Sequence, residues 1–121
     1  MREFIYSYRI PLSDTDAGGI VYHSNYIAIA ERARMEMLRD IGMEKMVLDA
    51  EEISVEYKRP GIFDDLVIVH STVSAIDDRR CVISQIAVRG DDTLAELQVK
   101  AVLRSLPDLE EVPVPHELTE A

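Results

Sequence analysis

Residues 24–42, SNYIAIAERARMEMLRDIG, carry the clearest structural signal in the chain. Apolar side chains recur at helical spacing, which places them on one face of an α-helix and most charged side chains on the opposite face. Ser24 is positioned to cap the first turn, and Gly42 to end the helix in a left-handed conformation. The apolar face consists of Tyr26, Ala30, Ala33, Met37 and Ile41, joined by Ile27, Ile29 and Leu38. We therefore predict one long amphipathic helix that begins at Ser24.

On both sides of this helix the apolar period changes to that of β-strands. Residues 3–10 alternate apolar and polar side chains, and Pro11 ends the pattern. After the helix, the polar turns DDRR and RGDDT join the last three of four further strands as hairpins. These four predicted strands are residues 53–58, 66–76, 81–88 and 94–103. The predicted fold is of the α+β class, with one long helix packed on a five-stranded antiparallel sheet.

The composition is that of an acidic protein without a membrane span. The 121 residues carry 23 Asp and Glu against 13 Lys and Arg, a formal net charge of −10. Such a surface repels polyanions, which argues against nucleic acid or an anionic membrane as the main partner. No apolar run reaches the ~18 residues of a membrane span, and the N-terminus lacks the layout of a signal peptide. We therefore expect a cytoplasmic location.

The chain divides into residues 1–106, which form one domain, and residues 107–121, an acidic tail with three prolines and four glutamates. The hydrophobic content of 47% is high for this length. A folded monomer then keeps apolar surface for other subunits, so we expect a homo-oligomer, either a dimer or a tetramer made of dimers.

Several kinds of chemistry lack support in the sequence. His23, His70 and His116 lie far apart without paired spacing, so no metal site is predicted. No serine lies in a G-x-S-x-G motif, and Cys81 falls within a predicted strand with no neighbouring histidine. The Gly18-Gly19 pair matches no phosphate-binding loop. Metal-dependent and Ser or Cys nucleophilic mechanisms are therefore disfavoured.

The segment DTDAGGIVYHSNY, residues 14–26, joins the first strand to the helix and contains the candidate catalytic groups. Gly18 and Gly19 let a ligand approach the main chain, and the first turn of the helix presents unpaired N–H groups. A carboxylate of Asp14 or Asp16 at the same point would complete a site for acyl transfer. On residue type and spacing alone, a purely structural role of both aspartates in the turn is the favoured interpretation.

Two longer segments favour the catalytic interpretation over the purely structural one. Residues 13–38, SDTDAGGIVYHSNYIAIAERARMEML, resemble the signature of hot-dog-fold acyl-CoA thioesterases of the 4-hydroxybenzoyl-CoA thioesterase family, and above all its YbgC-like branch. Residues 55–69, VEYKRPGIFDDLVIV, are similar to the V-E-Y-x-x-P-A-x-x-D-D pattern of that family, with Gly61 in place of alanine. The resemblance implies that residues 1–106 are a hot-dog domain that hydrolyses acyl-CoA thioesters at a site between subunits, without a cofactor.

The resemblance also implies roles for individual residues. Asp16 matches the catalytic carboxylate, acting as nucleophile or as general base, with Asp14 in support. The amide that polarises the thioester carbonyl falls at His23, whose imidazole either assists catalysis or fixes the turn. The expected contacts to substrate and coenzyme A are Gly19, Tyr22, Asn25, Arg79 and Arg80, with Lys58 and Arg59 as a second basic cluster.

Two other functions stay open at this point. A hot-dog hydratase or dehydratase would use Asp16 together with His23, and a non-catalytic module would bind acyl-CoA without turnover. The sequence does not indicate the acyl group, nor whether it is carried by coenzyme A or by a carrier protein. Residues 43–52, MEKMVLDAEE, depart from the family by being shorter and more acidic.

Overall fold

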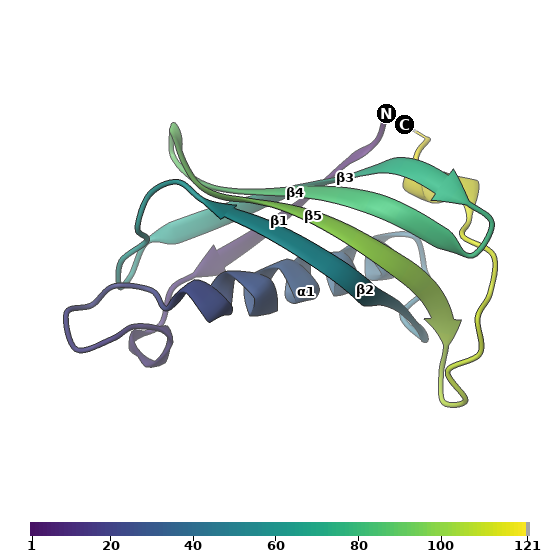
Figure 1. The fold of residues 1–121 in the computed structure, drawn as a ribbon, viewed down its shortest axis with the longest axis horizontal. Coiled ribbons are helices and arrows are strands. Elements are labelled where there is room, and N and C mark those ends of the chain that lie inside the picture. The colour runs from purple at the N-terminus through teal and green to yellow at the C-terminus, as the bar shows by residue number, and fades with distance from the viewer. Residues whose placement is uncertain (121) are drawn as a thin grey trace.

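The structure is a computed structural model that describes residues 1–120. Five strands form one antiparallel sheet in the order β1-β3-β4-β5-β2, and the sheet curves around the single long helix α1 (Figure 1). The elements in chain order are β1 (Glu3–Arg9), η1 (Leu12–Asp14), α1 (His23–Asp40), β2 (Met46–Tyr57), β3 (Leu66–Asp77), β4 (Arg80–Arg89), β5 (Asp92–Ser105) and η2 (His116–Leu118). This arrangement confirms the predicted α+β class and the hot-dog fold of one helix on a five-stranded sheet.

The C-terminal end of helix α1 agrees with the prediction, and its N-terminal end differs. Gly42 has a φ of +77°, and the N–H of Met43 donates to the carbonyl of Leu38 at 2.8 Å, which ends the helix as expected. The predicted cap at Ser24 is wrong, because the helix begins at His23 and the extended N-cap residue is Tyr22. The N–H of Tyr22 donates to the carbonyl of Asp14 at 3.2 Å. That bond holds Tyr22 extended, so helical geometry starts at the next residue.

Strand β2 is longer than the predicted strand over residues 53–58. It begins at Met46, which pairs with Ser105, and a bulge between Ala50 and Glu52 interrupts its register with β5. Before the bulge Leu48 and Ala50, at even positions, are buried or half-buried, and after it Ile53 and Val55, at odd positions, are half-buried. Because the bulge changes the phase of the alternation, the first half did not show the period of one continuous strand.

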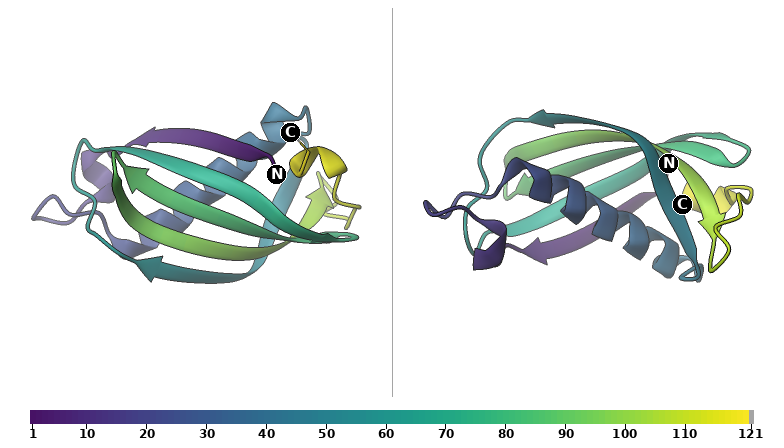
Figure 2. Two further views of the ribbon diagram at one scale, coloured as in Figure 1. Left: turned by 90° about the horizontal axis from the view of Figure 1, so that it is seen from above. Right: turned by 60° about the horizontal axis from the view of Figure 1, so that its bottom comes forward.

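The strand registers divide the molecule into two ends. Arg9 at the end of β1 pairs with Leu66 at the start of β3, and Tyr57 at the end of β2 pairs with Ala95 near the start of β5. The loop between β1 and α1 therefore lies at the same end of the sheet as the β2–β3 loop and the β4–β5 turn (Figures 1 and 2). The β3–β4 turn and the end of β5 lie at the opposite end.

The residues after β5 pack against the sheet. Val114 and Leu118 are buried, and the N–H of Val114 donates to the carbonyl of Asp78 at 2.8 Å. The predicted boundary between residues 1–106 and 107–121 stays a prediction, and Ala121 lies outside the described residues. Within the described chain, no helix has both the length and the apolar character needed to cross a bilayer.

Candidate functional site

Asp16 organises the loop between β1 and α1. Its carboxylate oxygen Oδ1 accepts hydrogen bonds from the N–H groups of Gly18 at 2.8 Å and Ile20 at 3.0 Å. Gly19 completes the turn with a φ of +79°, and its N–H donates to the carbonyl of Asp16 at 3.0 Å. Among the hydrogen bonds of the described residues, none engages Oδ2 of Asp16. One oxygen of this carboxylate therefore fixes the turn, and the other is free for chemistry.

Asp14 is engaged on both its side chain and its main chain. Its Oδ2 accepts from the Tyr8 hydroxyl at 2.8 Å, and its carbonyl accepts from the Asn25 side-chain amide at 2.7 Å. Burial, together with the hydrogen bond to Asp14, raises the pKa of Tyr8. Asp14 thus ties strand β1 to the helix start, in line with a supporting role. Asn25 contributes to this tie, and its predicted contact with substrate stays a prediction; nothing in the sequence motif pointed to Tyr8.

The first turn of α1 presents free donors. The helix has no side-chain cap, and within residues 1–120 the N–H groups of His23 and Ser24 have no acceptor. An antiparallel bridge between Thr15 and Val21 joins the two arms of the loop, so Asp16 and the helix start belong to one short hairpin. These N–H groups and the positive end of the helix dipole suit a developing oxyanion.

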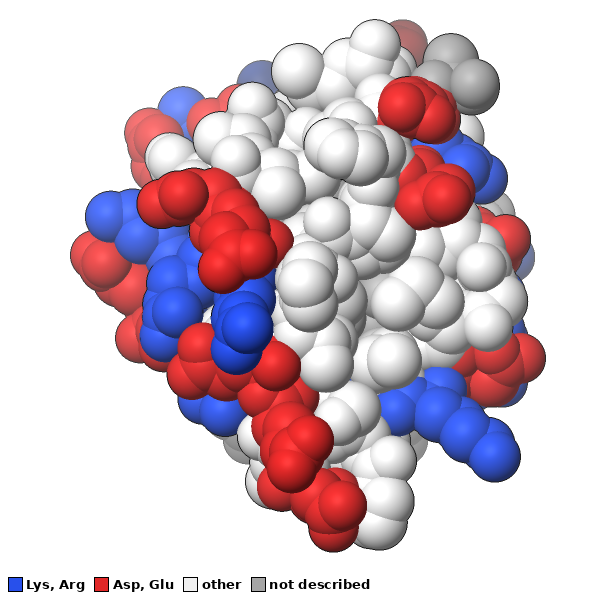
Figure 3. Space-filling view, turned by 90° about the vertical axis from the view of Figure 1, so that its right-hand side faces the viewer, with Lys and Arg blue, Asp and Glu red and all other residues white. Residues whose placement is uncertain are grey.

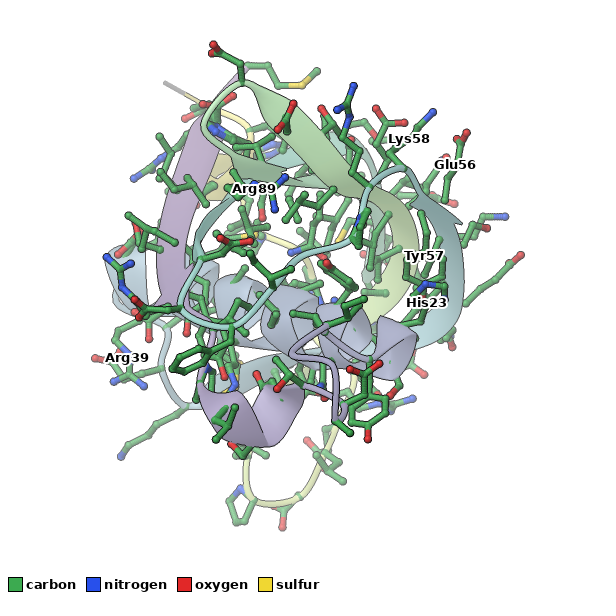
Figure 4. The ribbon with its side chains drawn as sticks, turned by 90° about the vertical axis from the view of Figure 1, so that its left-hand side faces the viewer. His23, Arg39, Glu56, Tyr57, Lys58 and Arg89 are labelled. Atoms are coloured by element: carbon green, nitrogen blue, oxygen red, sulfur yellow. The ribbon has the colours of Figure 1, made fainter. Side chains whose placement is uncertain are left out.

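The His23 imidazole stacks on Tyr57 at the end of β2. The ring centroids are 3.9 Å apart with an interplanar angle of 11°, and the Tyr57 hydroxyl donates to the His23 carbonyl at 3.0 Å (Figure 4). Both contacts fix the helix start against the sheet. Of the two roles considered for this imidazole, the geometry favours fixing the turn, and its catalytic role stays a prediction.

Tyr26 explains the glycine that replaces alanine in the second motif. The N–H of Gly61 donates to the buried Tyr26 hydroxyl at 2.9 Å, and a Cβ atom added at Gly61 would lie 2.6 Å from that oxygen. The carbonyl of Gly61 also accepts from the N–H of Val21 at 2.9 Å. The β2–β3 loop is therefore attached to both α1 and the loop of Asp16, at a distance too short for a larger residue. Burial raises the pKa of Tyr26.

A cavity of about 240 Å³ opens beside the helix start. His23, Tyr26 and Tyr57 line it together with the basic residues Lys58 and Arg59. The two cations form exposed ion pairs, Lys58 with Glu56 at 2.7 Å and Arg59 with Asp92 at 3.6 Å. Tyr22, the residue before His23, is 53% exposed, so a ligand can reach its side chain.

Arg79 and Arg80 lie at the other end of the sheet, in and after the β3–β4 turn. Arg80 bonds to Glu51 at 3.0 Å and to Glu111 at 3.1 Å, and these hydrogen bonds raise its pKa. Acidic and basic side chains alternate along one side of this end (Figure 3). One chain therefore does not bring Arg79 and Arg80 to Asp16, and their contact with coenzyme A stays a prediction.

The described residues offer neither a metal-binding cluster nor a reactive thiol. Across residues 1–120, no three His, Cys, Asp or Glu side chains cluster in a way that could hold a metal ion. Cys81 is buried, and burial raises the pKa of its thiol to about 11. The thiol is therefore protonated near neutral pH and is a poor nucleophile.

The known proteins that this chain resembles include several thioesterases. The pattern of the thioesterase superfamily matches residues 18–96. Acyl-CoA thioester hydrolase YbgC of Escherichia coli O157:H7 is 36% identical over 98 residues, covering 75% of this chain and 73% of the relative. Acyl-CoA thioesterase YbgC of Haemophilus influenzae is 30% identical, covering 98% and 93%. A hypothetical protein from Aquifex aeolicus, 30% identical, has a crystal structure that superposes with a TM-score of 0.80 and covers 94% of each chain.

The contact between Gly61 and Tyr26 can be tested by a double-mutant cycle. Gly61→Ala should lower the free energy of unfolding by about 1–3 kcal/mol, since its Cβ collides with the Tyr26 hydroxyl. In a Tyr26→Phe background that oxygen is gone, so the same substitution should cost much less. Urea denaturation of the four proteins measures the coupling. Costs that add within about 0.5 kcal/mol would contradict the proposed collision.

Proposed function

This chain belongs to the thioesterase superfamily, and from that premise we propose that it hydrolyses the thioester bond of acyl-coenzyme A at Asp16. One observation carries the proposal. The Asp16 carboxylate is oriented by two main-chain N–H groups through one oxygen, its other oxygen accepts no hydrogen bond from the described residues, and its loop leads directly into the uncapped first turn of α1. The similarity to YbgC acyl-CoA thioesterases supports the choice of substrate class.

The groups present can perform both halves of a hydrolysis. As a general base, Asp16 takes a proton from a water molecule whose oxygen attacks the thioester carbonyl. As a nucleophile, it attacks the carbonyl itself and forms an anhydride that water then opens. In either route the carbonyl oxygen becomes negative, and the N–H groups of His23 and Ser24 stabilise it by about 3 kcal/mol per donor. The thiolate of coenzyme A is the leaving group.

Lys58 and Arg59 are the basic residues best placed for the phosphates of coenzyme A. They line the cavity at the helix start, and their ion pairs are exposed, so a phosphate can replace a carboxylate partner at little cost. Arg79 and Arg80 lie at the far end of the same chain. They could reach the nucleotide only from another subunit of an oligomer.

Association of subunits fits the edge of the sheet. Strand β2 is the last strand of the sheet, so one side of its backbone has no partner strand among residues 1–120. Large apolar residues near the site are exposed, among them Ile20, Ile27 and Tyr57. A second subunit along this edge would cover them and close the cavity beside His23. The proposed assembly is a dimer or a tetramer made of dimers.

Asp16→Asn tests the catalytic role without disturbing the turn. Asparagine keeps an oxygen that can accept from Gly18 and Ile20, but it is neither a base nor a nucleophile. Release of thiol from acyl-CoA should fall by about 10²- to 10⁴-fold, with an unchanged circular dichroism spectrum. The matched control, Asp14→Asn, keeps an acceptor for Tyr8 and should lose much less activity.

The same assay separates the rival functions. Thiol release by the unchanged protein no faster than by Asp16→Asn, with both at the uncatalysed rate, would overturn the proposal in favour of a binding module. Equal release above that rate would remove Asp16 from the mechanism. An altered double bond with the thioester intact would instead indicate a hydratase or dehydratase.

Two double variants test the phosphate contact, one at Lys58 and Arg59 and the other at Arg79 and Arg80. The variant with Lys58→Ala and Arg59→Ala should raise KM for acyl-CoA by about tenfold, since each charge-assisted hydrogen bond is worth over 1 kcal/mol. The same acyl group on N-acetylcysteamine, which lacks phosphates, should show no change. If instead only the variant with Arg79→Ala and Arg80→Ala raises KM, the assignment to Lys58 and Arg59 is wrong.

Light scattering tests the assembly. The protein should elute with at least twice the mass of one chain at the concentration of the activity assay. A monomer with full thioesterase activity would contradict a site shared between subunits.

A further inference from the structure

The β2–β3 loop contains a charged side chain that the proposed mechanism does not use. Asp65 is the last residue of the segment VEYKRPGIFDD, residues 55–65. Its Oδ2 accepts a hydrogen bond of 2.8 Å from Nη1 of Arg89, which lies at the same end of the sheet as His23 (Figure 4). The Asp65 side chain is 15% exposed, whereas every other ion-paired carboxylate among residues 1–120 is at least 32% exposed. Its attraction to Arg89 is therefore the least screened by water.

Asp65 and Arg89 hold the loop on both sides of Gly61. Oδ2 of Asp65 also accepts from the N–H of Ile62 at 2.9 Å. Nη1 of Arg89 also donates to the carbonyl of Pro60 at 3.2 Å. The pair therefore fixes the main chain immediately before and immediately after this glycine.

Residues 61–63 are bonded in turn to residues 19–21 of the Asp16 loop. The two segments form an antiparallel bridge, and a main-chain hydrogen bond of 2.9 Å lies on each side of it. Ile20, in the middle of this bridge, donates its N–H to Oδ1 of Asp16 at 3.0 Å. A continuous path of hydrogen bonds and main chain therefore leads from Asp65 to the carboxylate proposed for catalysis.

The Asp16 turn has little packing of its own. Ala17, Gly18 and Ile20 are exposed, so apolar contacts contribute little to the position of the turn. Hydrogen bonds within the turn fix its shape, whereas the bonds to residues 61–63 fix its position beside the helix start. A displacement of about 1 Å at a reacting group lowers a rate by about 10²-fold. Whatever holds residues 61–63 therefore affects the rate through Asp16.

The buried arginine of the core has no such connection. Arg34 of α1 is 3% exposed, and its Nη1 donates to Oε1 of Gln85 at 3.0 Å. Its Nε is buried and has no hydrogen-bond partner within the described chain. Neither nitrogen contacts residues 14–22 or 60–65. Low exposure therefore does not by itself connect a charged residue to Asp16, and the path through Asp65 does.

We propose that Asp65, held by Arg89, is a positioning residue for the hydrolysis. It fixes residues 60–63, and these place the Asp16 carboxylate at the helix start. The inference rests on the proposed function and adds a residue that acts on the reaction through Asp16. The position of the Asp65 oxygen, more than its charge, is then what the reaction requires.

Three substitutions at Asp65 separate position from charge. Asp65→Asn keeps an oxygen in place for Ile62 and Arg89, Asp65→Glu keeps the charge but lengthens the side chain, and Asp65→Ala removes both bonds. Relative to the unchanged protein, kcat should fall by about 10- to 100-fold in Asp65→Ala and Asp65→Glu, and by about threefold or less in Asp65→Asn, with KM changed by about twofold or less. Thiol release from acetyl-CoA, hexanoyl-CoA and benzoyl-CoA measures both constants.

Glu111→Gln is the matched control at the opposite end of the sheet. Glu111 forms a bridge with Arg104 near the end of β5, and its carboxylate pairs with Arg80 at 3.1 Å. It is 32% exposed, the next value after that of Asp65. Its substitution removes the charge of a comparable ion pair without touching the Asp16 loop, so kcat should stay unchanged.

A double-mutant cycle with Asp16→Asn shows whether Asp65 acts through Asp16. Once the catalytic carboxylate is lost, its position no longer matters, so Asp65→Ala should lower the residual kcat by about twofold or less. A purely structural role would lower kcat by the same factor in both backgrounds. If Asp65→Ala does not fold, as judged by circular dichroism, Asp65→Glu takes its place. If the residual rate is too low to measure, the order of Asp65→Asn and Asp65→Glu decides.

The outcomes separate this inference from the proposed function. Equal losses in both backgrounds, a higher kcat for Asp65→Glu than for Asp65→Asn, or a change in KM alone would overturn the inference and leave the proposed function intact. A loss of kcat in Glu111→Gln as large as in Asp65→Ala would do the same. Failure of the unchanged protein to release thiol from any of the three thioesters would overturn the proposed function and the inference with it.

Discussion

The hydrogen bonds from Gly18 and Ile20 to one oxygen of Asp16 are the interaction on which the functional end of the molecule depends. They close the turn that carries the chain from the edge strand β1 to the start of α1. Only one of the two carboxylate oxygens of Asp16 accepts these bonds. A structural role for that oxygen and a catalytic role for the other therefore do not exclude each other. The bonds that build the turn also orient the free oxygen, which reduces the freedom that a reactive group would otherwise have to lose.

The sequence predicted the elements whose signal is local. The apolar period identified α1 and its end at Gly42, and the polar turns identified the hairpins of β3, β4 and β5. The two errors arise where a contact or a bulge overrides the local pattern. The bond between Tyr22 and Asp14 moves the helix start away from Ser24, and the bulge after Ala50 hides the first half of β2.

The parts of the site that sequence reasoning missed depend on contacts between distant segments. The pairing of Asp14 with Tyr8, the stack of His23 on Tyr57 and the close approach of Gly61 to Tyr26 each join residues from different elements. No spacing along the chain encodes them. Conversely, Arg79 and Arg80 have the right chemistry for phosphate, but the register of β3 with β4 sets them at the end of the sheet opposite Asp16.

Arg34 shows why burial and bonding must be considered together. An apolar residue of similar length, such as Met37 one turn later, would fill the space against the sheet without leaving a donor unpaired. A buried, incompletely bonded arginine is costly for folding, so packing alone gives no reason for it. Helix α1 carries both this arginine and the free N–H groups of its first turn. One helix therefore supplies part of the buried core and, at its first turn, the N–H groups proposed as oxyanion donors.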